Sequence, residues 1–196
     1  IGTDNNLWFY YGTGNWQKLQ QTSSSIDNRL YAVKDTQHPL FEKVNLSKNN
    51  DLKDVSNSSN DICPSQTGLG WFFKLDKNEK VTGKVAVGDA TVFVPRYTPH
   101  STDICKIGTS KVTAHEMLCG KKQDTIDLGE GVVTGVTYYK GTLYGGLSAI
   151  QDPENALVPK DGSTSEDKSV WSKKVGTPGS ATTPGTIKVE SWRELF

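Results

Sequence analysis

The chain has 196 residues, enough for one large domain or two small ones. Its 22 Lys and Arg residues balance 22 Asp and Glu residues, and no basic stripe alternates with aromatic residues, which argues against a nucleic-acid partner. Hydrophobic residues make up only 34% of the chain, and no apolar run approaches the roughly 18 residues of a membrane helix. Because Gly, Ser, Thr and Asn are frequent, the composition favours an all-β protein with long polar loops over a helical bundle.

The start of the chain and its cysteines bear on where the protein acts. Because the first residue is Ile1 rather than Met, we expect a leader or a longer N-terminal region to have been removed. Cys63, Cys105 and Cys119 form no C-x-x-C motif, which argues against a zinc ribbon or a haem-attachment site. One disulfide and one spare thiol is the simplest pairing count, and with the composition it predicts an exported, extracellular protein.

The first two predicted strands lie near the N-terminus. Residues 7–14 form an apolar run that ends on two glycines, and residues 28–35 form a second strand after a polar loop over residues 18–27. The Gly-Thr-Gly sequence at the end of the first strand is not a phosphate-binding loop, because neither a helix nor Gly-Lys-Ser/Thr follows it.

A long polar segment follows, from residue 37 to residue 66, dominated by Asn, Ser, Asp and Lys. Within it, residues 40–44 are compatible with a short helical turn or an extra strand. Residues 45–60 are too polar to be buried, and we expect them to form an exposed insertion.

The most regular part of the sequence predicts several strands in immediate succession. They cover residues 71–75, 81–87, 90–94 and 109–118, with tight turns or a polar loop between them. Pro95 limits how centrally the third of these strands can lie in a sheet, because proline cannot donate a ladder hydrogen bond. Short strands joined in sequence order make a β-meander, which is the unit of one propeller blade.

The rest of the chain predicts further strands and one long loop. Residues 123–128 are a candidate outer strand, and residues 131–139 and 142–149 form a hairpin about Lys140-Gly141. Residues 152–186 are rich in Pro, Ser and Thr and read as a loop, whereas the last residues, 186–196, form a final strand.

A repeat links two of these hairpins. Residues 82–93 resemble residues 134–144, since each segment is a strand, a glycine-containing turn and an aromatic strand. The offset is about fifty residues, and a period of about 40–50 residues with four strands per unit is typical of a β-propeller.

The sequence therefore predicts a partial β-propeller of two to three four-stranded antiparallel blades with long polar loops. The predicted blades cover residues 7–76, 80–128 and 131–196, the last with a long loop over residues 152–185. Because a propeller closes with at least four blades, the chain is expected to be incomplete by itself. The remaining blades are expected upstream in the parent protein or on a partner chain.

The residues that could carry catalysis do not form a convincing motif. His115-Glu116 begins an H-E-x-x-H pattern, but position 119 is a cysteine and the setting is a strand, whereas a zincin needs both histidines on one helical face. No G-x-S-x-G elbow occurs, and Glu166-Asp167 lies in a polar loop as a solvated pair. The sequence predicts no catalytic residue and no enzymatic activity.

Two other sets of residues are candidates for binding sites. His100, Asp103 and Cys105 could converge on zinc in a loop, but a disulfide and solvated polar groups explain them better, and no metal or cofactor site is predicted. Trp16 and Trp171 lie in polar segments, and they are the two tryptophans that could present a ring to a sugar or a surface.

Four local pieces of the sequence point to a family. They are the pair FYYGTG and RLYAVKD, the segment GWFF followed by EKV, the stretch VFVPRYTP with Asp103, Cys105 and GTS, and the terminal SWREL. Together these pieces cover about half of the chain, and in this order they resemble the C-terminal propeller of the PilY-type or PilC-type tip proteins of type IV pili.

This resemblance implies a non-enzymatic component of a type IV pilus tip. Such a protein would act in adhesion and in pilus assembly and retraction, by binding minor pilins and a host or abiotic surface. The alternative is a propeller enzyme of the quinoprotein-dehydrogenase or glycan-active type. Some family members bind calcium through a D-x-D/N-x-D/N-G loop, but no such run occurs here, so no calcium site is expected.

The resemblance also bears on the disulfide. A cysteine before the Gly-Trp strand often accompanies the later one in this family, which implies a Cys63–Cys105 pair with Cys119 spare. The alternative is a Cys105–Cys119 pair, which would link the two ends of one loop and strand.

Overall fold

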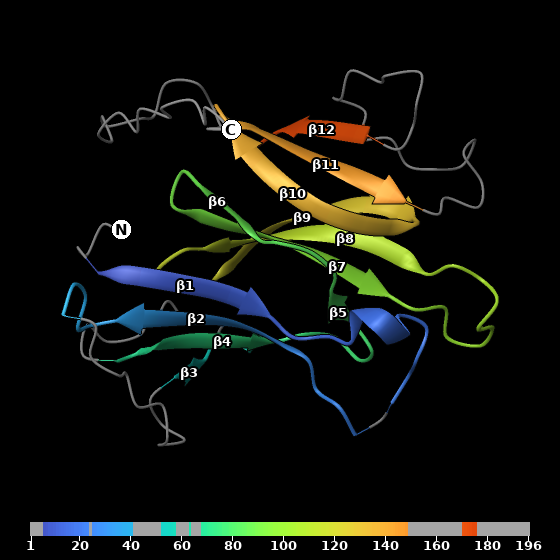
Figure 1. Ribbon diagram of the computed structural model, residues 1–196, viewed down its shortest axis with the longest axis horizontal. Helices are drawn as coiled ribbons and strands as arrows, with labels where there is room; N and C mark the ends of the chain where they lie inside the picture. The colour runs from blue at the N-terminus through green and yellow to red at the C-terminus, as the bar shows by residue number, and fades with distance from the viewer. Residues whose placement is uncertain are drawn as a thin grey trace, which may run out of the picture.

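The computed structural model describes residues 6–23, 25–40, 52–57, 63, 68–148 and 170–175. These residues form three β-sheets and one short 3-10 helix, η1 (Trp16–Lys18), and the all-β prediction is confirmed. The sheets follow one another along the chain, and they lie one above another in Figure 1. Among the described residues they do not close into a barrel or a propeller.

Sheet A is the N-terminal sheet, with the strand order β1-β2-β4-β3. Its strands are β1 (Leu7–Gly12), β2 (Arg29–Asp35), β3 (Lys53–Asp54) and β4 (Gly70–Lys74). The predicted strands 7–14, 28–35 and 71–75 are confirmed within a residue or two, whereas β3 was not predicted and runs parallel to β4. Beside β3, Val55 is 3% exposed and packs in the core, so the prediction of an exposed insertion is wrong at that position.

Sheet B is the central sheet, with the strand order β5-β7-β8-β9 and β6 also paired with β7. Its strands are β5 (Lys80–Val81), β6 (Ala86–Gly88), β7 (Thr91–Thr98), β8 (Thr109–Glu116) and β9 (Lys122–Glu130). The predicted outer strand at residues 123–128 is confirmed as β9, which lies at the edge of the sheet. The predicted strand 81–87 is instead interrupted, and its two pieces are β5 and β6.

Sheet C contains the strands in the order β10-β11-β12. They are β10 (Val132–Tyr139), β11 (Thr142–Ser148) and β12 (Val170–Lys174), and Tyr139 pairs with Thr142 across the predicted hairpin. The prediction of an unbroken loop over residues 152–186 is wrong at β12, which pairs with β11. The predicted final strand, residues 186–196, lies outside the described residues.

Sheet B is covered on both faces, and this produces two hydrophobic cores. One core joins sheets A and B through the buried residues Leu30, Ala32, Val55, Trp71, Leu75, Val81, Val92 and Val94. The other joins sheets B and C through Ala86, Phe93, Val112, Ala114, Ile126, Leu128, Val133, Val136, Leu143, Leu147 and Trp171. Because neighbouring residues of β7 contribute to opposite cores, this strand is buried almost continuously, unlike a strand with one solvated face.

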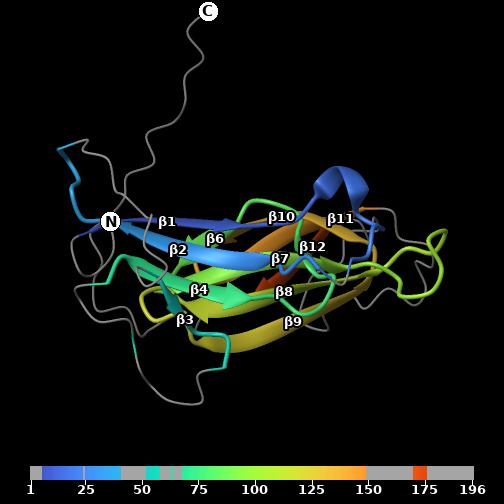
Figure 2. The same cartoon turned by 90° about the horizontal axis from the view of Figure 1, so that it is seen from below.

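The strands of the three sheets follow one another in the same direction across the stack. Figure 2 shows β1, β6 and β10, the early strands of the three sheets, along one side of the stack, and β3 and β9 along the opposite side. The three sheets are therefore stacked face to face, and in each of them the strand order runs from the same side of the stack towards the opposite side.

Pro95 lies near the middle of β7, which has paired strands on both sides, so the prediction that it would keep its strand from a central position is wrong. The carbonyl of Pro95 accepts a hydrogen bond from the backbone N–H of Thr82 at 3.3 Å, so this carbonyl points away from β8, towards the segment that contains β5 and β6. The nitrogen and the carbonyl of a strand residue point to the same side, so the Pro95 nitrogen also points towards that segment. The segment is interrupted between β5 and β6, and the missing N–H of proline costs no hydrogen bond to β8.

The two hairpins of the sequence repeat differ in their turn residues, and this difference predicts a stabilising substitution. Asp89 and Ala90 both have positive φ, at 47° and 57°, in the two-residue turn between β6 and β7. The equivalent second position of the β10–β11 turn is Gly141, with φ 77°. Ala90→Gly should raise the free energy of unfolding by about 0.5–1 kcal/mol, because relief of left-handed strain exceeds the entropic cost of glycine.

Urea unfolding of the Ala90→Gly variant checks this prediction, with Gly141→Ala as the matched control. The control should lower the free energy of unfolding by about 1 kcal/mol, since it places a Cβ in the left-handed region. A loss of stability in the Ala90→Gly variant would contradict the strain argument.

Candidate functional site

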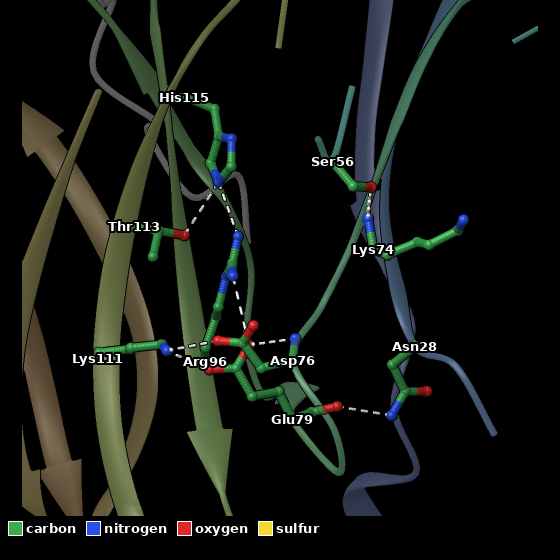
Figure 3. A network of polar contacts seen from close by, with 9 residues as sticks. All are labelled: Asn28, Ser56, Lys74, Asp76, Glu79, Arg96, Lys111, Thr113 and His115. Atoms are coloured by element: carbon green, nitrogen blue, oxygen red, sulfur yellow. Dashed lines mark hydrogen bonds and ion pairs between the residues drawn. The ribbon is translucent and has the colours of Figure 1, made fainter. Parts of the chain in front are cut away.

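The charged side chains that lie deepest in the molecule gather between sheets A and B (Figure 3). Arg96 of β7 and His115 of β8 are on the face of sheet B that turns towards sheet A, and Glu79 precedes β5. Arg96 and Glu79 are each 1% exposed, and His115 is 0% exposed. We call these three residues the buried polar network, and Lys111 (26% exposed) and Asp76 (79% exposed) lie at its solvent edge.

Arg96 stands at the centre of the network. Its Nη1 lies 3.4 Å from Oε2 of Glu79, and its Nη2 lies 2.7 Å from Nε2 of His115. Its guanidinium carbon is 5.0 Å from the centroid of the Phe73 ring of β4, so the cation also faces an aromatic ring of sheet A.

Glu79 forms ion pairs with two cations, Arg96 and Lys111. Its Oε2 accepts a hydrogen bond from the backbone N–H of Asp76 at 3.0 Å, and its Oε1 forms an ion pair with Lys111. Lys111 also lies 3.4 Å from Oδ2 of Asp76. Burial by itself would lower the pKa of Lys111, but the hydrogen bond and charge of Glu79, followed by Asp76, outweigh burial and raise this pKa.

The contacts of His115 define its protonation state. Its Nδ1 lies 3.1 Å from the carbonyl oxygen of Gly120, which can only accept, so Nδ1 carries the proton. Its Nε2 therefore accepts from the Arg96 guanidinium, and Thr113 Oγ1 lies 3.2 Å away. Burial, followed by the charge of Arg96, lowers the pKa of His115 from 6.5 to about 3, and the imidazole is neutral near pH 7.

This lowered pKa predicts acid destabilisation. The unfolded chain takes up a proton at His115 near pH 6.5, whereas the folded chain does so only near pH 3. The stability linked to neutral His115 is thus fully present above pH 6.5 and is lost as the pH falls towards 3. The free energy of unfolding should decrease by about 2 kcal/mol from His115 alone between about pH 6 and 4.5.

Urea unfolding at a series of pH values measures this loss. The variant His115→Gln retains an amide donor for Gly120 and an oxygen acceptor for Arg96 but cannot titrate, so its stability should depend less steeply on pH. Titration of the folded His115 imidazole near pH 6.5 in an NMR experiment would contradict the prediction.

The network is suited to a structural role on the face of sheet B that sheet A covers. Its opposite charges are paired, its imidazole is neutral, and the rings of Trp71 and Phe73 lie 6.2 Å and 4.8 Å from the His115 ring. Breaking such a buried pair leaves an uncompensated charge, which is strongly destabilising.

A small hollow lies nearby, at the loops beside η1. It has a volume of about 70 Å³ and is lined by Asn15, Gln21, Ser23, Ile26, Asn28, Asn78 and Lys80. The Lys80 ammonium donates to the carbonyl oxygens of Leu19 and Gln21, each at 2.7 Å, and burial lowers the pKa of Lys80. The hollow has room for only a few water molecules. Lys80 stabilises the loop after η1 through its hydrogen bonds to the Leu19 and Gln21 carbonyls.

The outer face of sheet A, turned away from sheet B, carries exposed aromatic side chains. Tyr11, Tyr31 and Phe72 are register partners across three strands, and Phe9 lies two residues before Tyr11 on the same face. Phe9 is 53% exposed and Tyr11 is 46% exposed. We call these four residues the aromatic face, and because it is open it is the candidate interaction site of the described chain.

Both predicted disulfide pairings are wrong, because Cys63 bonds to Cys119 and leaves Cys105 free and exposed. Cys119 lies in the turn between β8 and β9, which is pressed against sheet A: the Trp71 Nε1–H and the Tyr10 hydroxyl both donate to the carbonyl oxygen of Met117. Cys105 instead lies in the loop between β7 and β8, on an exposed part of the molecule.

The loop that holds Cys105 also contains the other residues weighed for zinc. The backbone N–H of Asp103 donates to Nδ1 of His100 at 3.1 Å, and the backbone N–H of Cys105 donates to Oδ1 of Asp103 at 2.9 Å. These side chains thus hydrogen-bond the loop backbone. Among the described residues, no three His, Cys, Asp or Glu side chains gather where they could hold a metal ion.

The two predicted surface tryptophans have different environments. Trp16 lies on η1 and is 70% exposed, so its ring is accessible, and contact with a surface stays a prediction. Trp171 lies on β12, is 5% exposed and belongs to the core between sheets B and C. A Cβ at Gly145, its register partner, would come within 2.5 Å of the Trp171 ring, so that ring occupies space left by glycine. The prediction of a surface role for Trp171 is wrong.

Two features escaped sequence reasoning. The aromatic face could have been recognised from Leu7-Trp8-Phe9-Tyr10-Tyr11, where aromatic residues occupy both faces of a strand in a sheet that needs only one core face. Arg96 could have been singled out as a charge inside the apolar run of β7. Its pairing with Glu79 and His115 depends on the fold.

Comparison with known proteins adds no assignment. The sequence matches no protein-family model, no curated protein and no solved structure. Within the part of the chain that the structure describes, no helix is long and apolar enough to cross a membrane.

Proposed function

We propose that the chain is part of the C-terminal β-propeller of a PilY-like tip protein of type IV pili. In this proposal it acts without catalysis, at the pilus tip or bacterial outer surface. It binds minor pilins and a host or abiotic surface, and it supports adhesion and pilus assembly and retraction. The rest of the propeller lies upstream in the parent protein or on a partner chain.

The stacking of the three sheets is the observation that carries the proposal. Each sheet is largely an antiparallel meander, each packs face to face on the next, and their early strands lie along one side. Blades of a propeller have this arrangement around a central axis. The four resembling sequence pieces supply the link to the pilus family.

The distribution of polar and apolar groups supports binding rather than catalysis. The strongest cluster of charges is buried and paired between sheets A and B, where a substrate would have to displace Trp71 and Phe73. The exposed large apolar side chains include Trp16 on η1 and Phe9 and Tyr11 of the aromatic face. Exposed apolar groups gathered on one face are typical of protein-interaction surfaces.

Pull-down of purified minor pilins by the immobilised chain tests the proposal. We expect retention of at least one minor pilin, and adhesion of the chain to an abiotic surface that weakens in a Trp16→Ser variant. A Cys105→Ser variant is the control, because it also alters an exposed position but removes no ring. Failure to retain any minor pilin, a copurified quinone, or turnover of an alcohol or a glycan would overturn the proposal.

A further inference from the structure

Three of the four rings of the aromatic face lie next to one another. The Tyr11 and Tyr31 ring centroids are 5.1 Å apart with an interplanar angle of 19°, and those of Tyr31 and Phe72 are 6.1 Å apart with an angle of 41°. The guanidinium carbon of Arg29 lies 4.8 Å from the centroid of Phe72 and covers that ring as well. Tyr31 therefore has a ring neighbour on each side, and Phe72 is contacted by both the Tyr31 ring and the Arg29 guanidinium.

This row of neighbouring rings favours one class of occupant. Across three strands it presents a broad apolar sheet surface rather than one isolated ring. Such a surface packs face to face against the side chains of another β-sheet. The ion pair on this face, between Asp54 Oδ2 and Lys74 Nζ at 2.8 Å, is satisfied within the face itself.

The outer face of sheet C is a second exposed sheet surface with apolar side chains. Tyr139 is 58% exposed, Tyr144 is 43% exposed and Val170 is 55% exposed. Tyr144 is the register partner of Thr137 on β10, and Tyr139 is the register partner of Thr142 on β11. This face carries no acidic side chain among the residues of β10, β11 and β12.

The internal packing shows how such faces meet. Sheet A packs on one face of sheet B, and sheet C packs on the other, with all three sheets progressing in the same sense. One more step of the same stacking would place the outer face of sheet C against the outer face of a sheet A. We propose that these two faces bind each other between two copies of the chain, head to tail.

The area of the faces favours two contacts over one. Three strands about 4.8 Å apart with about six residues at 3.4 Å each make a face of roughly 300 Å², so one contact buries roughly 600 Å² in total. A single contact is below the roughly 1,200 Å² of a stable interface, whereas a closed pair of copies uses both contacts and reaches it. A closed pair would contain six stacked sheets, which is within the range of blade numbers in propellers. The inference rests on the sheet packing and on one of the two arrangements in the proposed function, the one in which the rest of the propeller lies on a partner chain.

Sedimentation velocity of the purified chain over the micromolar range tests the proposal. We expect a species with twice the 21.5 kDa mass of one chain. Tyr11→Lys on the aromatic face and Tyr144→Lys on sheet C should each raise the dimer dissociation constant by at least about tenfold, because each places a charge in the contact. Ile104→Lys is the matched control: Ile104 is 77% exposed in a loop away from both faces, and this variant should dimerise like the wild type.

Mixing the two face variants distinguishes a head-to-tail contact from a contact between two identical faces. In the mixture, the intact sheet C face of the Tyr11→Lys chain meets the intact aromatic face of the Tyr144→Lys chain, while the two altered faces meet at the other contact. The mixed complex thus keeps one intact contact and each variant with itself keeps none, so the one-to-one complex should form more tightly than either variant with itself but more weakly than the wild-type dimer. Circular dichroism and thermal unfolding confirm that each variant folds. A monomeric wild type, a dimer unaffected by either substitution, or no gain on mixing would overturn the proposal, and none of these outcomes bears on minor-pilin binding.

Discussion

Replacing Arg96 with methionine is expected to lower the free energy of unfolding by about 3–5 kcal/mol. The substitution removes the guanidinium that pairs with Glu79 and donates to His115, while methionine keeps much of the aliphatic volume. Glu79 would keep Lys111 as a cationic partner, but its Oε2 would no longer face the positive guanidinium, and the Glu79 side chain is only 1% exposed. The loss arises because a buried carboxylate is left with too little compensation. Urea unfolding at pH 7 measures it.

Two further variants separate charge from packing. Glu79→Gln in the Arg96→Met background should recover part of the stability, because it removes the carboxylate that Arg96→Met leaves undercompensated. Asp54→Ala breaks the ion pair with Lys74. Because the side chain of Asp54 is 37% exposed and that of Lys74 is 45% exposed, this variant should lower the free energy of unfolding by less than about 1 kcal/mol. Equal losses in the Arg96→Met and Asp54→Ala variants would contradict a special role for the buried polar network.

Loss of the Cys63–Cys119 disulfide is expected to cost about 4 kcal/mol. The bond closes a segment with a sequence separation of 56, and chain-entropy arithmetic for a loop of that size predicts a loss of this order. The bond also anchors the β8–β9 turn, where the carbonyl of Met117 accepts from Tyr10 and Trp71 and the carbonyl of Gly120 accepts from His115. The double variant Cys63→Ser/Cys119→Ser, unfolded in urea, measures the loss.

Cys105→Ser is the matched control for the disulfide. Because Cys105 is free and exposed, this variant should change the free energy of unfolding by less than about 0.5 kcal/mol. Peptide mapping under non-reducing conditions should recover one cross-linked peptide containing residues 63 and 119. A cross-linked peptide that contains Cys105 would refute the pairing.

The disulfide illustrates a limit of reasoning from a family pattern. The resemblance implied a Cys63–Cys105 pair, and the alternative joined Cys105 to Cys119, so Cys105 took part in both. Residue 63 lies in the sheet A part of the chain, and the β7–β8 loop and the β8–β9 turn lie at opposite ends of the strands of sheet B. Local sequence contains no information about which end lies beside residue 63.

Local patterns were sufficient for most of the secondary structure. Alternating and continuous apolar runs bounded by Gly, Asn and Asp predicted the strands that became β1, β2, β4 and β7 to β11, because side-chain period and turn chemistry act over a few residues. The short strand β3 and the strand β12 were missed. Each lies in a polar segment where a single apolar residue, Val55 or Trp171, is buried by a distant sheet.

Only the tertiary structure decided which side chains are buried and which are open. Trp16 and Trp171 looked alike in sequence, yet one ring is exposed on η1 and the other fills the space beside Gly145. Arg96, Glu79 and His115 are far enough apart in the chain that nothing local pairs them. They meet because β5, β7 and β8 are neighbours in sheet B, and sheet A then covers them. Strand formation follows from neighbouring residues, whereas burial, charge pairing and the exposure of the aromatic face follow from how whole sheets stack, which short-range patterns do not encode.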